Sequence, residues 1–305
     1  MTKHIITSGS KAADIDVFAC AIAYEELLRL EGKDALAVIP GKLTSTVTPS
    51  ILKLHPSYAT QHVHQPGDVY VLVDISDPRH VPTFVDVQYV VEVYDHRKGN
   101  EEFWKQNDHV RACIDLIGSC GTLIWEEYKK RGKAADISTA SAQLLLASIV
   151  SNTLNFQAGM TNERDIEAFR ELSARIGLAS DWIYNYYTEQ ENHFHSDFIN
   201  LVDADVKTFE MGDSSFAVGQ IEMWNASKFW PRLDEIAGVM EKYNAAAWLV
   251  NMTDVREGVN YIFSRSEKGK VLVEKMFGVG FVNDVLKTPR MVMRKEIMAM
   301  MRGGW

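Results

Sequence analysis

The sequence predicts an α/β protein with a doubly wound, mainly parallel sheet in an N-terminal domain and a smaller α/β C-terminal domain with a mixed sheet. Three observations indicate this arrangement. Up to about residue 155, short apolar runs alternate with segments of helical periodicity. Several of these runs end at an acidic residue or a histidine. After about residue 200, strand-like segments predominate.

The N-terminal elements follow from periodicity and from residues that start or stop helices. Gly32 ends the first apolar helical pattern, and Pro40-Gly41 closes the strand that follows it. Thr161 can cap the last helix of this part. We expect strands at 5–7, 35–39, 69–73 and 89–94, and helices at 14–30, 121–131, 137–152 and 161–178.

The pattern changes at a polar stretch around 185–192, where strand periodicity is lost. We therefore expect a first domain at 1–185, a linker, either irregular or helical, at 186–200 and a second domain at 201–305. In the second domain, strands are expected at 206–209, 215–221, 246–252 and 261–264, with one helix around 229–243.

Composition restricts the classes of partner. The chain has 305 residues, 46% of them hydrophobic and 24% charged, as in an ordinary globular protein. Its formal charge of −9 gives no general attraction to nucleic acid or acidic membranes, so a polyanionic ligand needs a local cationic or metal-rich pocket. No run approaches the roughly 18 apolar residues that span a bilayer. Three cysteines without a CxxC pair favour a reducing compartment, and we expect a cytoplasmic location.

Carboxylates and one imidazole follow the predicted strands at the point where each strand ends. Asp14 and Asp16 follow the first strand, Asp74 follows 69–73, and Asp95-His96 ends 89–94. Each pattern alone is common, and a capping aspartate would explain it. Together they would meet at the edge of an open α/β sheet where ligands bind. Oxygen donors with an imidazole suit a divalent metal that holds phosphate.

These motifs resemble those of the DHH phosphoesterase superfamily, in the DHHA2 branch that contains family II inorganic pyrophosphatases and prune-type exopolyphosphatases. The resemblance covers nearly the whole chain. The matching segments are Gly9-Ser10 with Asp14 and Asp16, Asp74, Asp95-His96-Arg97, Gly118-Ser119, Ser151-Asn152-Thr153, Asp205-Val206-Lys207 with Phe209, and Met293-Arg294-Lys295-Glu296.

The resemblance implies a role for each matching residue. Asp14, Asp16, Asp74, His96 and Asn152 would hold one or two Mn²⁺ or Mg²⁺ ions. Asp74, His96 and Arg97 would take part in catalysis. Ser10, Ser119, Lys207, Arg294 and Lys295 would bind substrate, and closure of the second domain would exclude bulk water.

Three positions depart from the pyrophosphatase pattern. Ser10 stands where pyrophosphatases have a metal-binding histidine. Arg97 replaces the second histidine; it stays protonated, so it can neutralise phosphate charge but cannot act as an acid. That favours phosphoanhydrides, whose leaving group is already a weak base. Asn152 replaces an aspartate that bridges two metals, which lowers the negative charge of the site.

We therefore expect a metal-dependent phosphohydrolase that cleaves phosphoanhydride bonds in a small phosphate-containing substrate, by in-line attack of a metal-activated water. One alternative is a catalytically weakened relative that binds a phosphorylated ligand or a protein partner. A second alternative is an oligonucleotide phosphodiesterase. No membrane or nucleic-acid partner is expected, and a homodimer would cover the apolar edge strands of the sheet.

Overall fold

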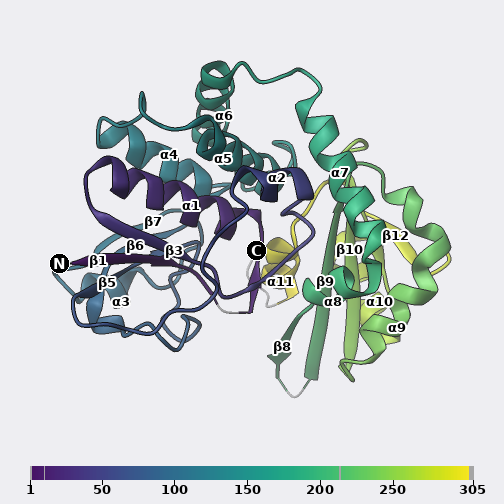
Figure 1. Cartoon of the computed structure of the whole chain (residues 1–305). Coiled ribbons are helices and arrows are strands. Elements are labelled where there is room, and N and C mark those ends of the chain that lie inside the picture. Colours follow the sequence, from purple (N-terminus) through teal and green to yellow (C-terminus); the bar gives the residue numbers. More distant parts are fainter. Residues whose placement is uncertain (1, 10, 213, 302–305) are drawn as a thin grey trace. The chain divides into compact units, whose positions relative to one another are not determined.

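The structure, a computed structural model, describes residues 2–9, 11–212 and 214–301. The chain divides into two units: the first comprises Met1–Phe156 and Met160–Ile183, and the second comprises Gln157–Gly159 and Tyr184–Trp305. Each unit is built on a five-stranded sheet with helices packed against it, as Figure 1 shows. The α/β fold class predicted from the sequence is confirmed.

The first unit contains the predicted parallel sheet. Its strands are β1 (Lys3–Thr7), β3 (Asp34–Val38), β5 (Asp68–Val73), β6 (Val90–Asp95) and β7 (Arg111–Ile114), and they lie in the order β3-β1-β5-β6-β7. All four neighbouring pairs are parallel. The chain leaves β1 toward β3 and later returns to β5 on the other side of β1. The point where the strand order reverses therefore lies between β1 and β5, where open sheets of this kind bind ligands.

Helices cover the two faces of this sheet. They are α1 (Ile15–Leu30), α2 (Pro49–Leu54), α3 (Glu101–Lys105), α4 (Cys120–Lys130), α5 (Thr139–Asn152) and α6 (Glu163–Ile176), with a 3₁₀ turn at Val87–Tyr89. Helix α1 packs against α4, α5 and β3, and α3 packs against β7 (Figure 1). Two short parallel strands, β2 (Ala12–Ala13) and β4 (Lys42–Leu43), pair beside the start of α1.

The connections after β1, β5 and β6 begin at the same edge of the sheet, because parallel strands present their carboxyl ends together. Asp14 is the N-cap of α1, and its side chain accepts a hydrogen bond from the backbone N–H of Val17 at 3.1 Å. Asp74 directly follows β5 with a φ of 51°, a left-handed conformation that is uncommon for a residue other than glycine. That turn directs the chain away from the sheet immediately after the buried strand.

The second unit contains the predicted mixed sheet, in the order β12-β11-β10-β9-β8. Strands β9 and β10 are parallel, whereas the other three pairs are antiparallel. Its strands are β8 (Lys207–Met211), β9 (Ser214–Met223), β10 (Ala247–Asp254), β11 (Val259–Phe263) and β12 (Val285–Lys287). Its helices are α7 (Trp182–Ser196, which begins at the boundary), α8 (Phe198–Ala204), a 3₁₀ helix (Ala226–Arg232), α9 (Leu233–Glu241), α10 (Glu267–Phe277) and α11 (Arg294–Met301).

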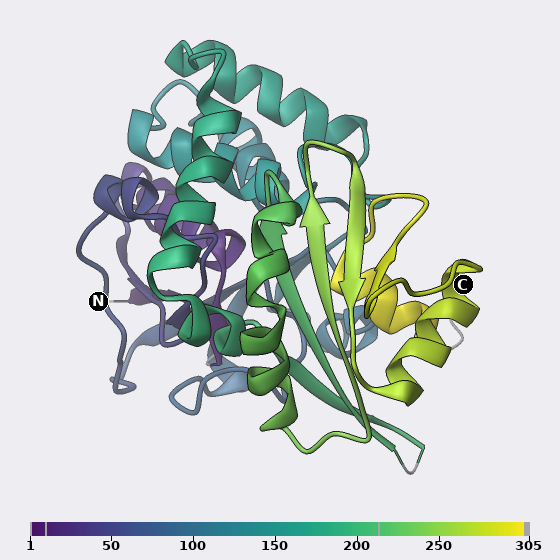
Figure 2. The ribbon, with the colours of Figure 1, turned by 90° about the vertical axis from the view of Figure 1, so that its right-hand side faces the viewer.

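Alternating side chains of β9 and β10 form two hydrophobic cores on opposite faces of the second sheet. Trp248 and Val250 contribute to the core under α8 and α9, and Ala247 and Leu249 to the core under α10 and α11. In Figure 2, the green α9 and the yellow α11 accordingly lie on different sides of the strands. This period of two is what a sheet covered on both faces requires.

Two details differ from the sequence-based expectations. Helix α6 begins at Glu163 and is capped by Asn162, so the prediction of Thr161 as the cap is wrong. Asn162 and Asp165 form a reciprocal capping box, which satisfies two backbone N–H groups at once. The range 186–200, expected as a linker, lies within α7 and α8, and the domain boundaries remain a prediction. No helix in the described ranges is long and apolar enough to cross a membrane.

Candidate metal centre

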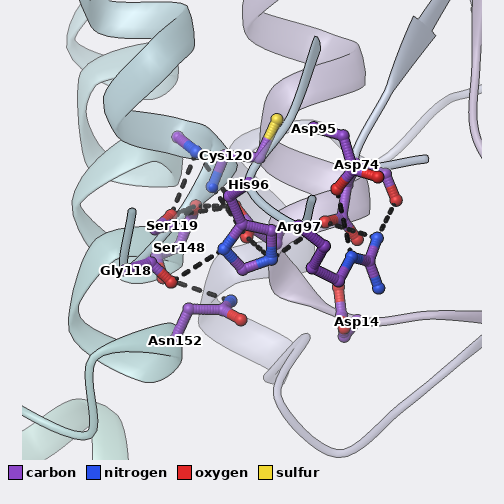
Figure 3. Close-up of polar contacts among 12 residues, drawn as sticks. Asp14, Asp74, Asp95, His96, Arg97, Gly118, Ser119, Cys120, Ser148 and Asn152 are labelled. Carbon is purple, nitrogen blue, oxygen red and sulfur yellow. Dashed lines mark hydrogen bonds and ion pairs between the residues drawn. The ribbon is translucent and has the colours of Figure 1, made fainter. Parts of the chain in front are cut away.

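Three buried side chains from the carboxyl edge of the first sheet meet in one place. Asp16 lies in the first turn of α1, Asp74 follows β5, and His96 follows β6. Each offers a ligand atom that lies within 4.8 Å of those of the other two, and each side chain is buried. Among the described residues, they are the only group of three or more His, Cys, Asp or Glu side chains with this geometry. Figure 3 shows Asp74 and His96 with the residues around them.

The backbone at the start of α4 fixes the imidazole of His96. Its Nδ1 atom lies 2.9 Å from the carbonyl oxygen of Gly118 (Figure 3). It also lies 3.2 Å from the carbonyl oxygen of Ile117. A carbonyl can only accept, so Nδ1 carries the proton and donates it. Nε2 then faces the carboxylates, 3.2 Å from Oδ1 of Asp74 and 3.6 Å from Oδ2 of Asp16. A hydrogen bond that fixes the tautomer in this way is typical of a metal-binding histidine.

Asp165, on α6, fixes the segment around Gly118 by hydrogen bonds. Its carboxylate accepts hydrogen bonds from the backbone N–H of Gly118 at 3.0 Å and from the hydroxyl of Thr122 at 2.7 Å. It also accepts one from the backbone N–H of Asn162. A fully buried carboxylate thus fixes the carbonyl that orients His96.

Asp16 is fully buried and accepts hydrogen bonds from several donors of α4 and α5. The backbone N–H groups of Cys120 and Gly121 donate at 3.0 Å, the Ser119 hydroxyl at 2.9 Å and the Ser148 hydroxyl at 2.5 Å. Burial raises the pKa of Asp16, and the charge of Asp74 raises it further. These donors and the N-terminal end of α4 stabilise the carboxylate of Asp16. The buried carboxylate of Asp74 lies close to it and opposes this stabilisation.

Asp74 is held in place by Arg97. The guanidinium donates to Oδ1 of Asp74 at 3.0 Å and also to its backbone carbonyl. A further hydrogen bond from Nε of Arg97 reaches Oδ1 of Asp95 at 3.0 Å, and Asp95 accepts one from Ser76 at 2.6 Å. Burial alone would lower the pKa of Arg97, but Asp74 and Asp95 raise it above its ordinary value, so the side chain remains a cation.

The donor set fits a divalent cation. Two carboxylates lie close together in a buried place, and the imidazole edge that faces them is the one that coordinates metals. Without a cation, either Nε2 takes up a proton or its lone pair opposes the oxygen of Asp74. Asp16, Asp74 and His96 are therefore the residues that would hold Mn²⁺ or Mg²⁺.

The other predicted site residues of the first unit lie around this group. Asp14 caps α1 and is not one of the three clustered ligands. Asn152 ends α5 and donates from its amide to the carbonyl of Ser148 at 3.4 Å. Ser119 is fully buried and bonds Asp16, so in this structure its hydroxyl positions a carboxylate. Ser10 lies outside the described residues. The predicted roles of these residues in metal or substrate binding stay predictions.

The predicted phosphate-binding cations Lys207, Arg294 and Lys295 belong to the second unit. Lys207 begins β8 and is exposed, and Lys295 lies in the first turn of α11. Arg294 forms an ion pair with Asp205 at 2.7 Å. Their roles in substrate binding also stay predictions.

The sequence-based reasoning did not single out Asp165, Ser148 or Cys120. Asp165 and Ser148 lie within the helices expected at 161–178 and 137–152, and no motif marked either residue. The one available signal was a serine on an otherwise apolar helix face, because buried hydroxyls need partners.

No family model matches the sequence. A Bacillus cereus (strain B4264) protein named "Probable manganese-dependent inorganic pyrophosphatase" is 24% identical over 304 residues, which cover 96% of each chain. A Bacillus licheniformis protein of the same name is 23% identical over 299 residues, covering 96% of this chain and 95% of that protein.

Solved structures show the same fold. A Methanococcus jannaschii protein assigned to the family II inorganic pyrophosphatases matches with a TM-score of 0.74 and 18% identity, over 99% of this chain and 100% of the other. These matches support assignment of the chain to the DHH/DHHA2 family. An exopolyphosphatase-related protein of Bacteroides fragilis also matches this chain, with a TM-score of 0.53 and 15% identity, over 99% and 91% of the two chains.

Proposed function

We propose that this DHH/DHHA2 protein is a metal-dependent hydrolase of phosphoanhydride bonds, acting on pyrophosphate or another short polyphosphate. The observation that carries the proposal is the buried group of Asp16, Asp74 and His96, whose geometry suits a divalent cation. The Bacillus relatives are named as manganese-dependent, which favours Mn²⁺ over Mg²⁺.

The residues of the site would have separate roles in binding the cation and the substrate phosphate. Asp16, Asp74 and His96 hold the cation, and the carbonyl of Gly118 keeps the imidazole in the coordinating tautomer. A bound divalent cation supplies Lewis-acid stabilisation of phosphate charge and lowers the pKa of water, the two things that hydrolysis of a phosphoanhydride needs. Arg97, with its side chain 42% exposed, adds a permanent positive charge beside Asp74.

Arg97 is also the residue that favours anhydrides over phosphodiesters. Asp74 and Asp95 keep its guanidinium protonated, so it cannot give a proton to an alkoxide leaving group. A phosphate leaving group is already a weak base and needs charge neutralisation rather than a proton. The guanidinium can provide that.

The test is a phosphate-release screen on metal-stripped protein, with Mn²⁺ added back. Its substrates are pyrophosphate, tripolyphosphate, long-chain polyphosphate and a cyclic dinucleotide. We expect Mn²⁺-dependent release from at least one linear anhydride and none from the dinucleotide. Asp74→Ala should abolish that release. Asp136→Ala, which changes an exposed carboxylate paired with Lys133, should leave it unchanged.

A second candidate function is binding of a phosphorylated ligand without turnover. It is favoured by Asn152, an uncharged amide at the end of α5 beside the metal-binding group. Calorimetry with Mn²⁺ and imidodiphosphate distinguishes the two functions. Tight binding together with no hydrolysis of pyrophosphate over hours would favour the binding protein.

We also propose a cytoplasmic location, which the free cysteines Cys20, Cys113 and Cys120 support, since a reducing compartment keeps thiols unpaired. A homodimer that covers an edge of the first sheet remains a proposal. Sedimentation analysis of the purified protein would test it.

A further inference from the structure

Arg97 lies where several carboxylates converge. It donates to Asp74 and Asp95 at 3.0 Å each, and it is close enough to Asp14 to interact with its charge. Figure 3 shows the guanidinium with these three aspartates around it. The side chain thus takes the position of a cation shared by the carboxylates at the ends of β5 and β6 and at the start of α1.

The candidate ligands for a divalent cation also meet at Asp74, where Nε2 of His96 lies 3.2 Å from the same Oδ1 atom that accepts from Arg97. Asp16 and His96 meet Asp74 there, whereas Asp14 is engaged as the cap of α1. Asn152 adds no charge and donates its amide to a backbone carbonyl. No second group of three His, Cys, Asp or Glu ligands exists among the residues that the structure describes.

Formal charges lead to the same conclusion. Asp14, Asp16, Asp74 and Asp95 contribute −4, and Arg97 contributes +1, which leaves −3. One divalent cation brings the sum to −1. A second would bring it to +1, with two ions and a guanidinium competing for the same carboxylate oxygens. Two divalent ions and a guanidinium so near one another in a buried site would repel each other strongly.

We propose that this chain binds one divalent cation, at Asp16, Asp74 and His96, and that Arg97 is a built-in positive charge in place of a second ion. The inference rests on the proposed metal centre and specifies how many ions it holds. Phosphate would then meet one exchangeable cation and one permanent cation, both next to Asp74.

Metal stoichiometry tests the proposal without reference to activity. Metal-free protein is titrated with Mn²⁺ alone by calorimetry, bound manganese is counted after equilibrium dialysis, and the electron paramagnetic resonance spectrum shows whether ions are coupled. We expect one Mn²⁺ per chain in the wild type, with an uncoupled spectrum. Arg97→Lys keeps the charge and should also bind one.

The double variant Arg97→Gln with Asn152→Asp removes the guanidinium and adds a carboxylate. It should bind two Mn²⁺ ions per chain with a coupled spectrum, provided that circular dichroism shows it folded. Arg79→Gln, which changes an exposed arginine paired with Asp77, is the matched control and should bind one ion.

Each outcome decides the matter. Two coupled ions in the wild type overturn the inference but leave the proposed hydrolase intact. No bound Mn²⁺ in the wild type overturns both. If the folded double variant still binds only one ion, Arg97 is not the reason why the chain lacks a second ion. That result also overturns the inference. If the double variant does not fold, the wild-type count still decides.

Discussion

The Nε2 atom of His96 lies 3.2 Å from Oδ1 of Asp74, although 21 residues separate them in the sequence. The sheet brings them together: β5 and β6 are parallel neighbours, and the N–H of Asp74 still donates to the carbonyl of Tyr94 at 2.8 Å. The ladder therefore continues one residue beyond β5 and fixes the spacing of the two ligands.

His96→Ala should lower Mn²⁺ affinity by more than about 100-fold, because the loss of a partner behind a ligand alone typically costs about 10- to 100-fold. Calorimetric titration of metal-free protein measures the effect. His80→Ala is the control, since that exposed imidazole lies 3.5 Å from Asp77, outside the three-ligand group. Equal affinity of the His96 variant and the wild type would remove His96 from the metal centre.

Asp165→Asn tests the support behind His96. The amide can accept through only one oxygen, so either Gly118 or Thr122 loses its partner. We expect Mn²⁺ affinity to fall about 10- to 100-fold, with a loss of about 1 kcal/mol of stability from the capping box. Affinity measured well below the melting temperature separates the two effects. An unchanged affinity in the folded variant would mean that Gly118 does not need this support.

Gly121→Ala tests the packing around Asp16. A Cβ atom at position 121 would collide with the Ser148 side chain, whose hydroxyl donates to Asp16. We expect a loss of about 1–3 kcal/mol of stability together with weaker Mn²⁺ binding. Gly238→Ala is the matched control on helix α9, where a Cβ meets nothing within 4 Å, and it should be neutral or stabilising. Denaturant melts and metal titrations of both variants provide the comparison, and equal behaviour would contradict the account.

The pH dependence of the metal-free protein should reveal the raised pKa of Asp16. Burial and then Asp74 raise that pKa above its ordinary value of 3.8. The contribution of Asp16 to stability is therefore fully present below about pH 3.8 and is lost as pH rises through the raised pKa. Asp16→Asn does not titrate at this position. The free energy of unfolding of the wild type minus that of Asp16→Asn, measured in EDTA, should thus decrease as the pH rises above about 4. A constant or increasing difference would show that the pKa is not raised.

Much of the first unit could be predicted because its signals are local. The runs at 69–73 and 89–94 are apolar, rich in valine and tyrosine, and each ends at an aspartate, so both the strands and the ligands that follow them could be recognised. Strand β7 was missed, because Arg111–Ile114 is short and only partly buried at the sheet edge. The short α3 was missed for a similar reason, since five residues are too few to show a helical period.

The environment of the ligands could not be predicted, since it depends on contacts between distant segments. Asp16 bonds Ser119 and Ser148, which are 103 and 132 residues away. Nothing in the local pattern distinguishes Asp165 from any acidic residue at a helix start. The cap of α6 was misplaced by one residue because Thr161 and Asn162 both favour that position, and only the capping box with Asp165 decides between them.

The central claim is that Asp16, Asp74 and His96 bind a divalent cation. Anomalous scattering from crystals grown with Mn²⁺ tests it most directly, because it locates the ion independently of any assay. We expect an anomalous difference peak within bonding distance of one carboxylate oxygen of each aspartate and of Nε2 of His96. Crystals of Asp74→Ala should show no such peak. Manganese bound elsewhere, or absent from this group at saturating concentration, would contradict the account.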